Sequence, residues 1–155
     1  MRPTTIIADI MNRELPAIPH QNTLEDASQE FVKHQCHYLP VLNDKGQLVG
    51  ILSTLDVLST AIDYVEMGPQ AFSKAKEHLR VTDLMTREFY HIQEHATVQE
   101  ALELFENEQC WALPVLSGSQ LVGMITSFDL VNYFTHLSKY TLSRFKTATS
   151  KLPRK

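Results

Sequence analysis

Leu39-Pro40-Val41-Leu42 returns 74 residues later as Leu113-Pro114-Val115-Leu116, and this repeated segment decides the fold. Matches on its amino-terminal side keep the same offset, since Asp9-Ile10-Met11 returns as Asp83-Leu84-Met85. Their order along the chain is preserved, which indicates an internal repeat rather than chance similarity. The sequence therefore predicts two copies of one structural unit.

A helix is expected before the repeated strand in each copy. Thr23 with Asp26, and Thr97 with Glu100, have the spacing of a capping box, in which a hydroxyl and a carboxylate bond free amides at a helix start. Apolar residues then recur at intervals of three and four, as an amphipathic helix requires. They are Leu24, Ala27 and Phe31 in the first copy and Val98, Ala101 and Phe105 in the second.

The repeated strand is expected to form a hairpin with the apolar run that follows it. In the first copy, runs 38–42 and 48–52 flank Asn43-Asp44-Lys45-Gly46, whose residue types favour a tight turn. In the second copy the turn is shorter, at residues 117–119. The chain therefore returns on itself in an antiparallel pair in both copies.

Each unit is completed by an extended piece at its start and a second helix at its end. The extended pieces are residues 15–19 and 89–92, and the second helices begin near Thr54 and Ser127. Each unit thus runs strand, helix, strand, strand, helix, and the fold class is α+β. We expect the first unit at residues 5–66, a connecting helix at 67–80, the second unit at 81–136 and a basic tail at 137–155.

Composition limits the classes of protein that fit. The 155 residues are 43% hydrophobic and suit a folded globular chain, while the apolar runs are far shorter than the roughly 20 residues of a membrane span. No secretory leader is recognised, so a cytoplasmic location is expected. The two cysteines, Cys36 and Cys110, are interpreted as reduced, half-buried thiols.

The charge is distributed unevenly along the chain. The last 19 residues carry six basic residues and no acidic one, leaving 8 Lys and Arg against 18 Asp and Glu in the rest. An acidic body disfavours binding to nucleic acid. A solvated tail is favoured over one that contacts phosphates or a membrane surface.

The pattern G-x-x-[ST]-x-x-D ends the hairpin of both copies, as Gly50 to Asp56 and as Gly123 to Asp129. A helix start offers free amides suited to phosphate, and a nearby carboxylate can accept hydrogen bonds from ribose hydroxyls. The same spacing also fits a plain capping box. The glycine, the preceding strand and the recurrence favour a ligand site over a cap alone.

Together these features make the chain resemble the CBS domain family, modules named after cystathionine beta-synthase that occur in tandem pairs. The resemblance covers residues 5–132 and implies a stand-alone pair of the bacterial type. It rests on the Asp-x-Met segments, the capped helix starts, the Leu-Pro-Val strands and both G-x-x-[ST]-x-x-D endings. It implies two units packed through their sheets with pseudo-two-fold symmetry, and up to two clefts for AMP, ADP, ATP or S-adenosylmethionine.

The resemblance also implies the nucleotide-binding residues. Asp56 and Asp129 would hold ribose hydroxyls, with Ser53, Thr54, Thr126 and Ser127 near the ribose or first phosphate. Residues expected near adenine are Ala17, Ile18, Pro40, His91, Ile92 and Pro114. Many relatives carry Arg or Lys between the hydroxyl and the aspartate, and this chain does not. Arg13, Arg80 or Arg87 would have to reach the phosphate, and a surface position is favoured for each.

Other chemistry finds little support in the sequence. His34, Cys36 and His37 lie close together, but no fourth ligand accompanies them, so no metal site is expected. Trp111 is expected in the core or an interface rather than stacked on a base. No catalytic motif is recognised, so no catalytic residue is assigned and the chain is not expected to be an enzyme.

Two functions from different classes remain. The first is a regulatory pair that needs no obligatory cofactor, binds an adenine nucleotide or S-adenosylmethionine and transmits its level to an unknown partner protein or its own oligomer. The second is a ligand-free interaction module whose Ser/Thr-Asp motifs act only as helix caps. A homodimer is expected in either case.

Overall fold

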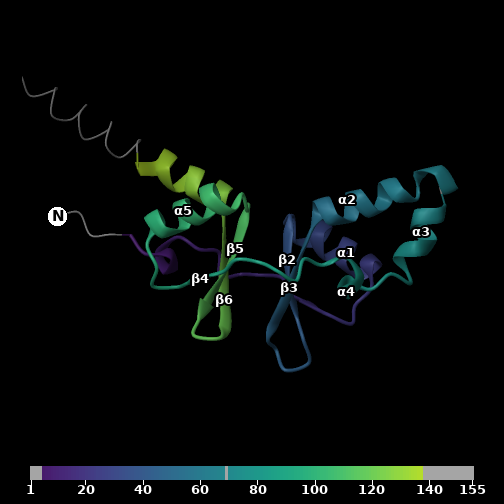
Figure 1. The fold of residues 1–155 in the computed structure, drawn as a ribbon, viewed down its shortest axis with the longest axis horizontal. Coiled ribbons are helices and arrows are strands. Elements are labelled where there is room, and N and C mark those ends of the chain that lie inside the picture. The colour runs from purple at the N-terminus through teal and green to yellow at the C-terminus, as the bar shows by residue number, and fades with distance from the viewer. Residues whose placement is uncertain (1–4, 69, 138–155) are drawn as a thin grey trace, which may run out of the picture.

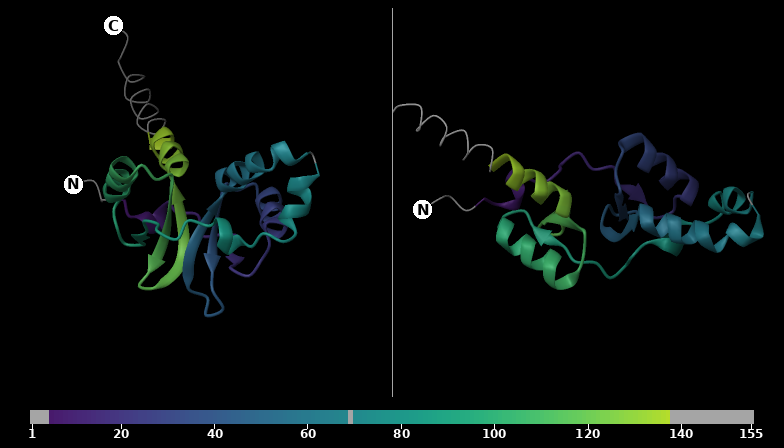
Figure 2. Two further views of the ribbon diagram at one scale, coloured as in Figure 1. Left: turned by 45° about the vertical axis from the view of Figure 1, so that its right-hand side comes forward. Right: turned by 90° about the horizontal axis from the view of Figure 1, so that it is seen from above.

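The computed structural model describes residues 5–68 and 70–137, and within them the chain forms two α+β units that lie side by side (Figures 1 and 2). The first unit contains β1 (Ile18–Pro19), α1 (Leu24–His34), β2 (Tyr38–Leu42), β3 (Leu48–Ser53) and α2 (Thr54–Asp63). The second contains β4 (Ile92–Gln93), α5 (Val98–Glu108), β5 (Ala112–Ser117), β6 (Gln120–Thr126) and a helix over residues 127–137. The predicted fold class is confirmed. The tail beyond residue 137 lies outside the described residues.

Each unit has one three-stranded sheet with the same topology. The strand orders are β1-β2-β3 and β4-β5-β6, with the first pair parallel and the hairpin pair antiparallel. Register is equivalent as well, because Val41 pairs with Gly50 in one hairpin and Val115 with Gly123 in the other. The repeat in the sequence therefore corresponds to a repeat of the backbone hydrogen-bonding pattern in the two sheets.

The predicted caps at the first helix of each unit are confirmed. The Asp26 carboxylate accepts hydrogen bonds from the Thr23 amide at 2.8 Å and hydroxyl at 2.9 Å. Glu100 does the same for Thr97, at 2.7 and 2.8 Å. These bonds satisfy amides that have no partner within the helix, which is why both helices begin where the spacing predicts.

The segments before the two units are exchanged between them. We call residues 5–12 and 79–86, which include the 3-10 helix η1 (Ile7–Asp9) and α4 (Val81–Leu84), the leader segments. Ile7 is fully buried in the core of the second unit, and Val81 is fully buried in the core of the first. In Figure 1 the purple first leader lies beside the second unit before the chain crosses to the first.

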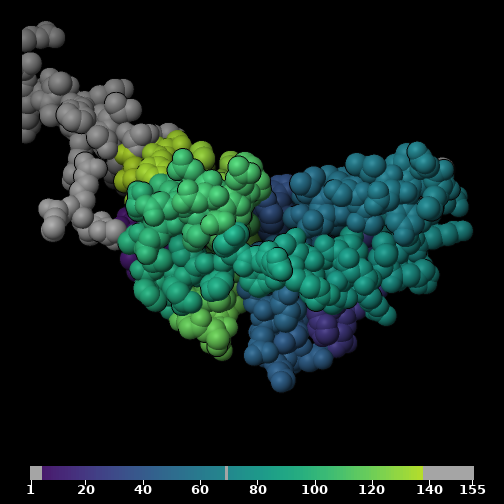
Figure 3. Space-filling view, viewed as in Figure 1, coloured from purple at the N-terminus to yellow at the C-terminus, as the bar shows by residue number. Residues whose placement is uncertain are grey.

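Backbone hydrogen bonds fix this exchange at equivalent positions. Asn12 exchanges two bonds with Met124, at 2.9 and 3.0 Å, and Thr86 exchanges two with Ile51, at 2.8 and 3.0 Å. Each leader segment thus extends the sheet of the unit that it does not precede in the sequence. The space-filling view in Figure 3 shows the two lobes meeting along a central seam that the teal chain crosses. Neither unit completes its core alone.

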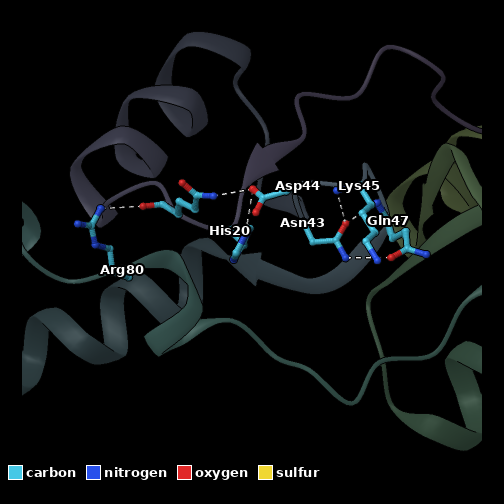
Figure 4. Close-up of polar contacts among 7 residues, drawn as sticks. His20, Asn43, Asp44, Lys45, Gln47 and Arg80 are labelled. Atoms are coloured by element: carbon cyan, nitrogen blue, oxygen red, sulfur yellow. Dashed lines mark hydrogen bonds and ion pairs between the residues drawn. The ribbon is translucent and has the colours of Figure 1, made fainter.

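Polar side chains tie the first hairpin turn to the rest of the first unit (Figure 4). The Asn43 side chain accepts hydrogen bonds from the Lys45 and Gln47 amides, both at 3.0 Å. Asp44 accepts one from Gln21, whose carbonyl accepts one from Arg80 at 2.8 Å. This cluster stabilises the turn, and none of its members lines the clefts described below.

The connection between the units differs in part from the sequence prediction. Within the connecting helix expected at residues 67–80, the structure has the shorter α3 (Ala71–Lys76), preceded by a 3-10 turn, η2 (Val65–Met67). Lys76 forms an ion pair with Glu25 at 2.6 Å, which fixes α3 against α1. No helix in the described residues is long and apolar enough to cross a membrane.

Candidate functional site

The two G-x-x-[ST]-x-x-D segments form complete capping boxes. The Asp129 Oδ2 atom accepts hydrogen bonds from the Thr126 amide at 2.7 Å and hydroxyl at 2.6 Å, and Asp56 Oδ2 binds Ser53 in the same way. The other oxygen, Oδ1, of both aspartates has no hydrogen bond within the described residues. Each carboxylate can therefore cap its helix and still accept hydrogen bonds from a ligand.

Asp129 lies in the larger of two clefts between the units, which we call the Asp129 cleft. Its volume is about 640 Å³. The second unit contributes Thr126, Ser127 and Asp129, while the first contributes Thr54 and the stretch from the end of α1 to the start of β2. A ligand bound there would contact both units at once.

Asp56 lies in the equivalent but smaller cleft, the Asp56 cleft, with a volume of about 260 Å³. Here the first unit contributes Ser53 and Asp56, and the second contributes residues 108–112. Reciprocal exchange of the leader segments explains this shared construction, because each unit's motif lies beside backbone that belongs to the other.

Tyr38 and Trp111 line both clefts. Burial, followed by the negative charge of Asp56, raises the pKa of the Tyr38 phenol. Trp111 is 66% exposed, so a core position for it is wrong. A ligand in either cleft would therefore lie near these two aromatic side chains.

The predicted nucleotide-binding residues do not all lie at one cleft. It brings Ser53 and Asp56 to one cleft and Thr54, Thr126, Ser127 and Asp129 to the other. The six residues expected near adenine line neither cleft: Ala17, Ile18, Pro40, His91, Ile92 and Pro114. Their contact with adenine stays a prediction that the geometry of the clefts does not support.

Burial explains the position of most of those six residues. Ile18 is 1% exposed because β1 pairs with the middle strand of its sheet, and its side chain packs in the first core. Pro40 and Pro114 are fully buried within β2 and β5. His91 and Ile92 line a separate cavity of about 610 Å³ beside α5, where neither motif aspartate lies.

Sequence reasoning missed Asn12 and Thr86, which line the Asp129 and Asp56 clefts respectively. Each follows the methionine of an Asp-x-Met segment, and each makes the two backbone bonds that anchor its leader segment. A polar residue at the same repeat position in both copies was the available signal. Which unit it would contact was not visible in the sequence.

The three arginines considered for phosphate binding are occupied elsewhere. Arg13, Arg80 and Arg87 donate to the carbonyls of Ala8, Gln21 and Thr82, at 2.8–2.9 Å. None of the three lines either cleft. The surface position that the sequence favoured for them is therefore confirmed.

Cys36 and Cys110 are free thiols of intermediate burial, and they line the Asp129 and Asp56 clefts respectively. Burial raises the pKa of both. Among the described residues, no group of three or more His, Cys, Asp or Glu side chains could hold a metal ion.

The fold is thus a tandem module of two α+β units with exchanged leader segments and a shared cleft beside each motif. Residues 7–63 and 81–136 both match the CBS domain, and the chain belongs to this family. Hypoxic response protein 1 of Mycobacterium tuberculosis is 26% identical over 144 residues, which cover 93% of each chain. The match to homoserine O-acetyltransferase of Methanosarcina acetivorans, 24% identical, covers 83% of this chain but only 22% of that enzyme.

Solved structures share the fold. Hypoxic Response Protein I with two coordinated zinc ions has a TM-score of 0.67 at 26% identity, covering 83% of this chain and 98% of that one. The CBS domain pair of protein MJ0100, in complex with 5′-methylthioadenosine and S-adenosylmethionine, has a TM-score of 0.70 at 24% identity. The match covers 86% of this chain and 98% of that one. CBSX2 in complex with AMP has a TM-score of 0.70 at 23% identity, with the same coverage of both chains.

Proposed function

We propose that this chain is a regulatory CBS pair that binds an adenine-containing ligand, acts in the cytoplasm and is not an enzyme. The observation that carries the proposal is the free Oδ1 atom of Asp129 in a cleft built from both units. Two proteins of the same fold are solved with such ligands, one with AMP and one with S-adenosylmethionine. Because both units line the cleft, a ligand there would favour one relative position of the units.

The residues present fit a nucleoside. Thr126 and Asp129 offer polar atoms for ribose, and the exposed rings of Trp111 and Phe128 offer apolar surface for a purine. The cleft volume of about 640 Å³ lies within the range of small-molecule sites. The pair would then report the level of an adenine nucleotide, as an energy sensor does, to a partner protein or to its own oligomer.

Calorimetric titration of the purified protein with AMP, ADP, ATP and S-adenosylmethionine tests the proposal. At least one of them should bind with measurable heat, and the bound form should melt at a higher temperature than the free protein. Absence of binding by all four, checked by native mass spectrometry of freshly purified protein, would overturn the proposal.

The second candidate is a ligand-free interaction module, and one specific observation favours it. An apolar face lies along α2 and the helix over 127–137, which run along the same edge of the molecule, uppermost in Figure 1. Its exposed side chains are Leu55, Leu58, Ile62, Phe128, Val131 and Phe134, each 44–69% exposed. Large exposed apolar surfaces on soluble domains commonly mark an interface.

We propose a second copy of the chain as the occupant of this face. Its two helices derive from equivalent repeat positions, so the face has approximate two-fold symmetry and can pair with itself. Leu58→Glu combined with Val131→Glu should shift the protein to monomer in sedimentation or light scattering. Val32→Glu, at a 79% exposed valine on α1, is the matched control. A wild-type protein that is monomeric at all concentrations would overturn the dimer.

A further inference from the structure

The two clefts differ in the number of carboxylates that line them. Among the residues that the structure describes, Asp129 is the single carboxylate that lines the Asp129 cleft, and the imidazoles of His34 and His37 line it as well. In the described residues, the Asp56 cleft is lined by the carboxylates of Asp56, Glu88 and Glu108, and by no Lys, Arg or His. The backbones of the two clefts are pseudo-symmetric, but the charged side chains that line the clefts differ.

Glu108 contributes to this difference at one repeat position. It occupies the place that His34 holds in the first copy, at the end of the first helix of its unit. Glu88, Tyr90 and Glu108 all line the Asp56 cleft. The Glu108 carboxylate raises the pKa of the Tyr90 phenol, and the charge of Glu88 adds to the effect.

The Asp56 cleft is also the smaller of the two clefts. Phe89 and Tyr90 line the Asp56 cleft where Leu15 and Pro16 line the other, so larger side chains fill the space. The volume of the Asp56 cleft is about 260 Å³, whereas that of the Asp129 cleft is about 640 Å³. Sites for small organic ligands span roughly 300–1,000 Å³.

We infer that the chain binds one phosphate-bearing adenine nucleotide, in the Asp129 cleft, and that Glu88 and Glu108 exclude such a ligand from the Asp56 cleft. This inference rests on the proposed function. It assigns the chemical class that each cleft accepts and identifies two specificity residues outside the repeated motif.

Coulomb repulsion supplies the physical reason. A nucleoside monophosphate carries a charge of about −1.5 to −2 at neutral pH. Two further carboxylates lining the cleft would weaken its binding, and a repulsion of about 1.4 kcal/mol corresponds to a tenfold loss of affinity. The Asp129 cleft lacks such added carboxylates, and the His34 ring at its edge lies 3.1 Å from Glu30. The His37 ring has no partner within the described residues.

The test uses AMP as the probe and native mass spectrometry with calorimetry as the readouts. Wild-type protein should bind one AMP per chain. Asp129→Asn should weaken AMP at least tenfold, whereas Asp56→Asn should change its affinity less than twofold. Asp26→Asn is the matched control, because Asp26 forms the same capping box at α1 and lines neither cleft.

The double variant Glu88→Gln/Glu108→Gln tests the specificity residues. With both charges removed and the side-chain shapes kept, a second AMP should bind, at least tenfold more tightly than any second binding to wild type. Conversely, AMP should slow alkylation of Cys36 in the wild-type protein and leave that of Cys110 unchanged, since each thiol lines one cleft. In the double variant, excess AMP should slow both.

The outcomes separate the two proposals. Binding of two equivalent AMP molecules to wild type, or loss of AMP in Asp56→Asn but not in Asp129→Asn, would overturn this inference while the proposed function stands. A stoichiometry of one that persists in the double variant would overturn the role of Glu88 and Glu108. If AMP, ADP, ATP and S-adenosylmethionine all fail to bind, the proposed function itself fails.

Discussion

Gly123 lies directly against Met11: a Cβ atom on the glycine would be 2.6 Å from the Met11 Sδ atom. Gly50 stands in the same relation to Met85, with a separation of 2.5 Å. A side chain at the glycine of each G-x-x-[ST]-x-x-D motif would thus displace the methionine of the exchanged leader segment. Two motifs that looked separate in the sequence are two sides of one contact.

Gly123→Ala should therefore destabilise the protein by about 1–3 kcal/mol, as overpacking does. Met11→Ala also costs stability, since Met11 is 8% exposed. Because both changes act on one contact, the double variant should lose at least about 1 kcal/mol less than the sum of the single losses. Denaturant unfolding measures the free energy of unfolding of the two single variants and of the double variant. Gly123→Ala with Met85→Ala, a methionine from the other contact, should be additive, and equal coupling in both pairs would contradict the packing role.

Exchange of the leader segments predicts which unit each core substitution loosens. Ile7→Ala should cost about 2–5 kcal/mol and speed amide exchange in β5 and β6, because Ile7 is buried in the second core. Val81→Ala, the matched variant, should act on β2 and β3. Hydrogen exchange with peptide-level mass spectrometry distinguishes these patterns. Faster exchange of β2 and β3 in Ile7→Ala, with β5 and β6 unchanged, would show that the leaders are not exchanged in solution.

Local structure was predictable from the sequence because local chemistry determines it. The capping boxes at Thr23 and Thr97 and the strand Tyr38–Leu42 lie where spacing and residue type place them. The exchange was not predictable, since no local pattern shows which unit the segment around Ile7 packs against.

The candidate site was predictable only in part, for a related reason. Asp56 and Asp129 could be found because a repeated motif carries them. Pro40 and Pro114 could not be excluded, since which strand residues reach a cleft depends on how the two sheets face each other. Glu108 departs from the repeat, so the repeated motifs do not indicate that it lines a cleft.

Asp129→Ala should lower the free energy of unfolding by about 1 kcal/mol without any ligand, because the Thr126 amide and hydroxyl lose their acceptor. For a chain of this size that corresponds to a melting temperature lower by roughly 3 °C. Asp26→Ala should cost about as much, since it removes the same cap from α1. Unchanged melting of Asp129→Ala alone would mean that its carboxylate does not cap the helix in solution.

Thiol reactivity should report the burial of both cysteines. Burial raises the pKa of Cys36 and of Cys110, so the reactive thiolate should form only above the ordinary value of about 8.5. The alkylation rate of each, followed by mass spectrometry, should therefore rise at higher pH in the folded protein than in denaturant. The negative charge of Glu108 contributes at Cys110, so Glu108→Gln should move that profile to lower pH and leave Cys36 unchanged. Folded and unfolded profiles that coincide would contradict the burial.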